Sequence, residues 1–263
     1  MIFLRAIILS VFSILVIVFA FVFFTFDTDY QLEKALNAFL KGEHDKALVT
    51  LEKVSYELRP SEQALYRSYI SKEQDDYAKA YEEIKAALVE GKKQNNTPYL
   101  LEIHLNKACI EFLLFDDKAF SDTIQEIITL APNNHFAQLF LGLKYYLDEE
   151  YGQALTMWSN LPPTRYSSEW MKLSFSHSFS PTWLSLRKAH CHIEEEEYLI
   201  GRKILEKHIP LNSSEEEVEK AFLMGLSYAK EAEQKPLIAA MPYYQLAQSY
   251  FDKVPVHHKK FWR

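Results

Sequence analysis

Residues 140–158, FLGLKYYLDEEYGQALTMW, carry two apolar helical patterns separated by the polar residues DEE. They fit the repeat pattern W-x2-L-G-x2-Y…A-x3-F, except that Gln138 replaces the first aromatic residue, and a tryptophan is the last aromatic residue. The matching residues are Leu141, Gly142, Tyr145, Ala154 and Trp158. Because Gly142 and Ala154 are small, the pattern predicts two antiparallel helices that approach closely there, with aromatic side chains filling the wider spaces around them.

The same spacing recurs along the chain and predicts a stack of helix pairs. Two positions twelve residues apart mark the two helices of a unit at Ala35 and Ala47, Ser68 and Ala80, Ala108 and Phe120, Gly142 and Ala154, and Ala189 and Gly201. Phe120 departs from the pattern, because a large side chain stands where the other units have a small one. A sixth unit runs from Met224 to Phe251 with an insertion between its helices.

In this pattern the sequence resembles the tetratricopeptide repeat (TPR) family over residues 29–255, most specifically at 101–161. The resemblance implies paired antiparallel helices stacked into a right-handed superhelix. In the family, the first helix of each pair lines a concave surface that commonly holds a protein partner. The resemblance implies no reaction.

The start of the chain differs from the repeats. Residues 6–24 are uncharged, and a helix of this length just crosses a hydrocarbon layer of roughly 30 Å. A cleaved signal peptide is the alternative, but the apolar run continues past the small residue at Ala20. With Arg5 before the span and Asp27 and Asp29 after it, the N-terminus is expected to be cytoplasmic. The chain would then be a single-pass membrane protein with an extracytoplasmic repeat domain, periplasmic if bacterial.

The predicted fold class is all-α, an N-terminal transmembrane helix followed by an α-solenoid of about five or six TPR-like helix pairs. The predicted organisation is a membrane anchor at 1–26, repeats one to four at 27–160, an irregular connection at 161–182, repeats five and six at 183–255, and a basic tail at 256–263.

Composition argues against several classes of function. The net charge of -7 leaves no broad basic surface for nucleic acid. The six glycines do not form a phosphate loop or a nucleophile elbow, so we expect no enzymatic activity and no cofactor. Cys109 and Cys191 lie in apolar helical patterns and are expected to be buried thiols, with a disulfide left open.

One cluster supports an alternative function as a divergent metal-dependent enzyme. His190, Cys191 and His192 are residue types that bind zinc. On a helix, however, only His190 and Glu194 share a face, because neighbouring residues point in different directions. The alternative to a metal site is that these residues form a partly buried helix end.

The TPR resemblance also selects a partner-binding groove on the first helices. Its residues are Leu105, Asn106, Cys109, Phe112, Phe136, Leu139, Phe140, Leu143 and Tyr146. This groove would be apolar, so the expected ligand is an apolar or amphipathic segment of a protein or peptide. The alternative is that these side chains pack internally, since such stripes commonly form a core. The leading hypothesis is a membrane-tethered scaffold for protein interactions, with a role in assembling or chaperoning exported or envelope proteins.

Overall fold

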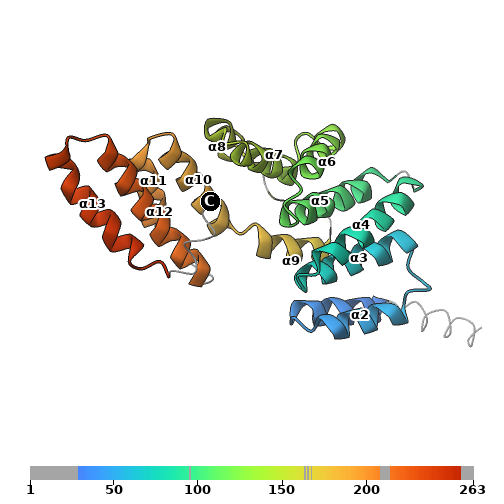
Figure 1. Cartoon of the computed structure of the whole chain (residues 1–263). Helices are drawn as coiled ribbons and strands as arrows, with labels where there is room; N and C mark the ends of the chain where they lie inside the picture. Colours follow the sequence, from blue (N-terminus) through green and yellow to red (C-terminus); the bar gives the residue numbers. More distant parts are fainter. Residues whose placement is uncertain are drawn as a thin grey trace, which may run out of the picture. The chain divides into compact units, whose positions relative to one another are not determined.

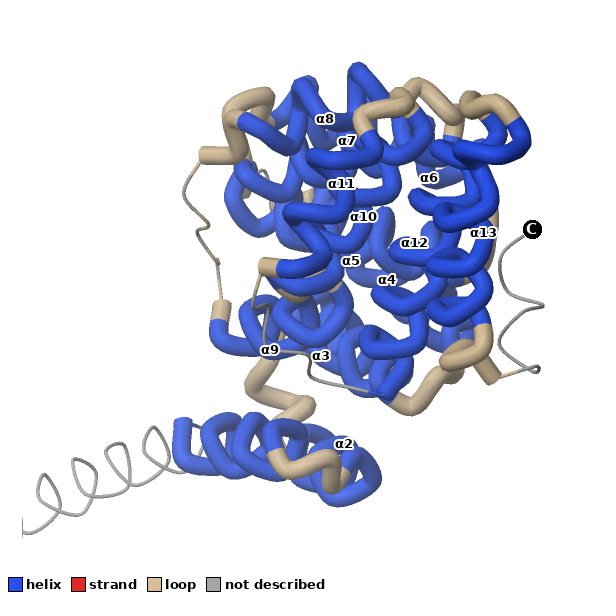
Figure 2. Tube along the Cα trace, turned by 90° about the vertical axis from the view of Figure 1, so that its left-hand side faces the viewer, coloured by secondary structure: helices blue, strands red, loops and turns tan. Residues whose placement is uncertain are grey.

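The chain folds into helices joined by short turns. The computed structural model describes residues 29–94, 96–162, 164, 166, 168–207 and 214–255, and no strand occurs among them (Figure 2). The chain is helical over 29–40. The labelled helices that follow are α2 His44–Lys53, α3 Pro60–Glu73, α4 Tyr77–Lys92, α5 Thr97–Leu113, α6 Asp117–Leu130, α7 His135–Leu147, α8 Tyr151–Ser159, α9 Glu169–Ser178, α10 Pro181–Glu194, α11 Tyr198–Glu206, α12 Ser214–Glu233 and α13 Leu237–Phe251.

The described residues fall into two compact units. Unit 1 lies within Met1–Phe120 and takes in Ser167–Ser174, and unit 2 lies within Ser121–Tyr166 and Phe175–Arg263. In unit 1, α3 packs against α4 as an antiparallel pair, and α4 packs against α5 (Figure 1). In unit 2 the pairs are α7 with α8, α10 with α11 and α12 with α13. The predicted all-α succession of helix pairs is therefore present.

Small side chains allow the paired helices to approach closely. In unit 2 the Trp158 ring of α8 lies against the Gly142 backbone of α7, so closely that a Cβ atom at Gly142 would overlap the ring. The indole nitrogen donates a hydrogen bond to the Leu139 carbonyl at 3.0 Å. The corresponding small residues of the other pairs are also buried, namely Ala35, Ala47, Ser68, Ala80, Ala108 and Ala189.

Five turns between successive helices each contain one residue in the left-handed conformation, with positive φ. These residues are Gly42, Asp75, Phe115, Glu149 and Glu196. The amide of the next residue donates to a carbonyl five positions back, as in Glu150 to Tyr145 at 2.8 Å. This is the Schellman ending, which favours glycine because a Cβ atom is strained at positive φ. Only the first of the five turns uses glycine, and the others retain that strain.

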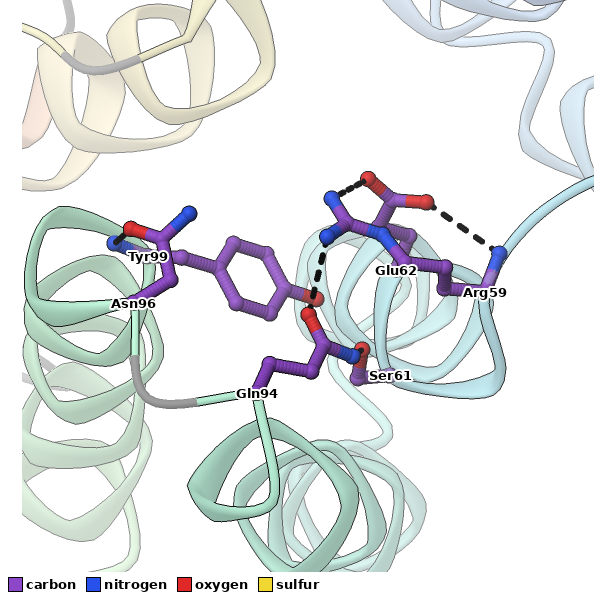
Figure 3. A network of polar contacts seen from close by, with 6 residues as sticks. All are labelled: Arg59, Ser61, Glu62, Gln94, Asn96 and Tyr99. Atoms are coloured by element: carbon purple, nitrogen blue, oxygen red, sulfur yellow. Dashed lines mark hydrogen bonds and ion pairs between the residues drawn. The ribbon is translucent and has the colours of Figure 1, made fainter.

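A polar network holds the start of α3 against the connection between α4 and α5 (Figure 3). Arg59 donates to the Gln94 side chain at 2.9 Å, and Gln94 donates to the Ser61 hydroxyl at 2.6 Å. Arg59 also pairs with Glu62 and lies over the Tyr99 ring, 5.5 Å from its centroid. These contacts fix the orientation of successive helices at one end of unit 1.

The prediction of a transmembrane helix is corrected. It concerns residues 6–24, which lie outside the described residues, as does the tail at 256–263. Within the described residues, no helix is both long enough and apolar enough to cross a membrane. Even α12, with 20 residues, has three glutamates in its first turn, and charges are costly in hydrocarbon. For the described residues the fold class is an all-α succession of helix pairs, and the predicted transmembrane helix and single-pass membrane localisation find no support in them.

We predict that Gly142→Ala lowers the free energy of unfolding by about 1–3 kcal/mol, because the added methyl group overpacks the contact with Trp158. Chemical denaturation of the parent and the variant measures the difference. Exposed Glu149→Gln is the control and should change stability by less than about 0.5 kcal/mol. Equal stability of Gly142→Ala and the parent would show that the helix contact is looser than described.

We predict that Phe115→Gly stabilises the chain by about 1 kcal/mol, because glycine adopts positive φ without strain. The Phe115 side chain is 88% exposed, so its removal sacrifices little packing. A rise in melting temperature checks the prediction, and a fall would mean that the exposed ring contributes a stabilising contact.

Candidate functional site

The predicted groove residues lie on the first helices, four on α5 in unit 1 and five on α7 in unit 2. All of them are buried except Phe112 and Tyr146, which are half-buried. Asn106 donates to the Ser68 hydroxyl at 2.7 Å, which ties α5 to α3. The burial agrees with the alternative of internal packing, and partner binding at these residues stays a prediction.

In unit 2, Phe175 of α9 and Phe179, which follows α9, pack against the apolar face of α7. The ring centroid of Phe175 lies 5.0 Å from that of Phe136 in an edge-to-face arrangement. Phe179 approaches Phe140 in the same way at 5.1 Å. Such aromatic pairs add to the stabilisation from buried area. Two of the predicted groove residues, Phe136 and Phe140, are therefore covered by aromatic side chains of the same chain.

In unit 1, the first part of α9 lies on first helices. Trp170 packs against Phe39 of the helix 29–40 and against Tyr66 of α3, with centroid distances of 4.9 and 5.1 Å. The Trp170 side chain is only 5% exposed. Figure 1 shows the start of α9 beside α3. We call Phe39, Tyr66, Tyr69, Lys72, Glu73 and Glu102 the first-helix surface of unit 1.

Glu102 of α5 supplies the first polar contact with this segment. It accepts hydrogen bonds from the Ser168 hydroxyl at 2.6 Å and from the Tyr69 hydroxyl at 3.0 Å. Burial and the neighbouring Glu102 carboxylate raise the pKa of Tyr69 well above its ordinary value, so that Tyr69 stays a hydrogen-bond donor. The buried carboxylate is thus satisfied in part by a hydroxyl from the chain segment that lies on it.

Lys72 and Glu73 of α3 supply the second polar contact. The Ser174 hydroxyl donates to Glu73 at 3.2 Å, and the Lys72 ammonium donates to the Ser174 carbonyl at 3.4 Å. Lys72 also pairs with Glu73 at 3.3 Å. Ser174 is therefore held through both its side chain and its backbone.

The opposite side of the segment faces solvent. Glu169 and Lys172 are exposed and pair with each other at 3.1 Å, whereas Trp170, Met171 and Ser174 are buried. The segment is an amphipathic helix whose buried side rests on three first helices of unit 1. The arrangement can hold an aromatic anchor flanked by two hydrogen-bonding positions.

The residues of the proposed metal site form a different network in unit 2. The Tyr146 hydroxyl lies 2.5 Å from His190 Nδ1, and His190 Nε2 lies 3.3 Å from Glu194. The Lys230 ammonium donates to the second Glu194 oxygen at 2.5 Å, so it already supplies the positive charge that a metal ion would bring. Among the described residues, no group of three or more potential ligands could hold a metal ion. His190 and Glu194 therefore act as links between helices.

Both cysteines are buried thiols, as the sequence predicted, and they form no disulfide. Burial raises the pKa of Cys191 to about 12, which keeps the thiol protonated and unreactive at neutral pH.

No family model and no curated protein matches the chain. Among solved structures, a tetratricopeptide repeat protein from Parabacteroides merdae ATCC 43184 is 14% identical, with a TM-score of 0.49, and the match covers 84% of this chain and 99% of that chain. At this identity and TM-score the likeness carries no argument about the fold, the site residues or a partner. The TPR-like character of the fold rests on the antiparallel helix pairs and on the small buried residues between them.

The TPR-like pairs were visible in the sequence, but the segment at α9 was missed. The sequence pattern predicted an irregular connection at 161–182, and no site residue was assigned there. The available signal was the apolar spacing of Trp170, Met171 and Phe175, which places these side chains on one side of a helix. Prolines before it and a high serine content obscured that signal.

We predict that His190 makes the chain less stable as the pH falls below about 6.5. Burial lowers the pKa of His190, against the opposing effect of Glu194, and Arg187 and Lys230 lower it further. Tyr146 of α7 contacts the ring as well. Because the unfolded chain binds the proton more readily, the contribution is present above the unfolded pKa and is lost as the pH falls through the lowered folded pKa.

Urea denaturation of the parent and of His190→Gln at pH 7.5 and pH 5 measures this effect. The parent should lose more stability between the two values than the variant does. An identical loss in both proteins would show that His190 is not the group responsible.

Proposed function

We propose that the chain is a non-enzymatic scaffold, without a cofactor, that binds an amphipathic helical segment of a protein partner on the first-helix surface of unit 1. One observation carries the proposal: this surface already holds a helical segment of that class, the chain's own residues 168–174. Binding a helix in this way needs no reactive group.

The side chains on the surface favour such a ligand. The rings of Phe39 and Tyr66 both pack against Trp170, which we call the aromatic seat, and large aromatic residues held in this way commonly contribute most of the binding energy. Glu102 and Glu73 accept hydrogen bonds from hydroxyl groups. An acidic ligand side chain next to Glu102 or Glu73 would be repelled, because two ionised carboxylates at close range repel each other. The surface therefore favours an aromatic residue flanked by neutral hydrogen-bond donors.

The expected role in assembling exported or envelope proteins depended on the predicted transmembrane helix. Because the described residues contain no such helix, the proposal is limited to binding a protein partner with an apolar or amphipathic segment.

Site-specific photo-crosslinking in the source cells tests the proposal. A photoreactive amino acid at position 66 of the full chain should crosslink to a helical segment of a partner that contains an aromatic residue. The matched control is position 89, where Val89 of α4 is exposed and lies on the second helix of its pair. Crosslinks from position 66 that reach only the chain's own α9 would contradict the proposal, as would the same proteins captured from both positions.

A further inference from the structure

Helix α9 differs from every helix around it. Its neighbours in sequence belong to the pairs α7 with α8 and α10 with α11, whereas α9 is a single helix between them. It is also the only segment after Phe120 whose residues join unit 1 among the described residues. The contacts that hold it there are made by the Trp170 ring, by the Ser168 and Ser174 hydroxyls and by the Ser174 carbonyl.

We propose that α9 is a built-in, displaceable ligand: residues 168–174 occupy the binding site of unit 1, and a partner helix with the same arrangement of side chains must compete with them. This inference rests on the proposed function, since it names how the same surface is regulated and what it recognises. The recognised arrangement is a hydroxyl residue, an aromatic residue two positions later, an apolar residue next to it, and a second hydroxyl residue four positions after the aromatic one. In the chain these are Ser168, Trp170, Met171 and Ser174.

The boundaries of α9 allow it to leave without breaking a helix pair. After it, α10 begins with its own cap, in which the Ser180 hydroxyl accepts from the Trp183 amide at 3.0 Å, and Pro181 occupies the first turn. Before it, α8 ends at Ser159 and Pro162 intervenes. Neither the cap of α10 nor the end of α8 includes a residue of the first-helix surface.

The contacts of α9 are also of the kind that a second helix can replace. The two serines donate to Glu102 and Glu73, and water or another hydroxyl can take over those bonds. In unit 2, release of α9 would withdraw Phe175 and Phe179 from Phe136 and Phe140, which uncovers two of the residues predicted from the TPR resemblance.

A tethered ligand is an effective competitor. A segment joined to its own site by a short connection acts at an effective concentration on the order of millimolar. A free helix with the same contacts therefore binds weakly until the tethered copy is weakened. The surface is hidden from weak ligands and open to a partner that binds more tightly than the tethered copy.

A direct test uses a fluorescent synthetic peptide with the sequence of residues 166–180 and purified full-length chains. Fluorescence anisotropy should show at least about tenfold tighter binding to Trp170→Ala than to the parent, because the tethered competitor has lost its anchor. Glu169→Gln changes only the exposed side of α9 and should bind like the parent. Adding Tyr66→Ala to Trp170→Ala should remove the gain, since the peptide then lacks its seat.

A second variant guards against misfolding of Trp170→Ala. Ser174→Ala removes one hydroxyl contact and leaves in place the Ser168 hydroxyl that caps the first turn of α9, and it should also bind the peptide more tightly than the parent. Circular dichroism of each variant should match the parent. Equal affinity of the parent and both α9 variants would overturn the inference, as would a gain that survives Tyr66→Ala.

The outcomes separate the two proposals. If partner crosslinks form at position 66 but the α9 variants bind the peptide no better than the parent does, the built-in ligand is wrong and the scaffold function stands. If the α9 variants gain affinity but position 66 finds no partner in cells, α9 is a ligand of this surface and the scaffold function fails.

Discussion

The structure depends on close contact between the two helices of each pair, which only small side chains permit. Gly142 shows the constraint most clearly, because the Trp158 ring occupies the space in which any larger residue would place its Cβ atom. Where Phe120 replaces the small residue, its ring lies 5.9 Å from that of Phe112, so aromatic packing takes the place of close backbone contact. Ser68 combines both roles, since it is small and also accepts a hydrogen bond from Asn106.

Close pairing leaves one side of each first helix available for other contacts. In unit 1 that side carries Phe39, Tyr66 and Glu102, and it takes up residues 168–174. In unit 2 the corresponding helices are joined through Tyr146, His190, Glu194 and Lys230. The first helices thus hold an amphipathic segment in unit 1 and a polar network in unit 2. The segment in unit 1 is the reason that we favour a helical partner as the ligand.

The repeat pattern could be predicted from the sequence because it depends on local spacing. Ala154 and Trp158 stand at fixed distances from Gly142, and their positions follow from helix geometry alone. The seat of Trp170 could not be predicted in this way, because Tyr66 and Phe39 lie more than a hundred residues before it in the chain and no periodicity relates them. The role of His190 and Glu194 could not be predicted from the sequence either, because Lys230, which pairs with Glu194, comes from another helix. Local patterns define the pairs, and long-range contacts define the site.

The central claim is that α9 is a bound ligand and not a fixed part of the stack. Hydrogen exchange followed by mass spectrometry on an isotopically labelled full chain, with an unlabelled peptide of residues 166–180 at saturation, tests it most directly. We predict that the amides of Trp170 to Ser174 exchange at least about tenfold faster when the peptide is present, while those of α4 are unchanged. Exchange in α9 that is as slow as in α4 and insensitive to the peptide would contradict the account.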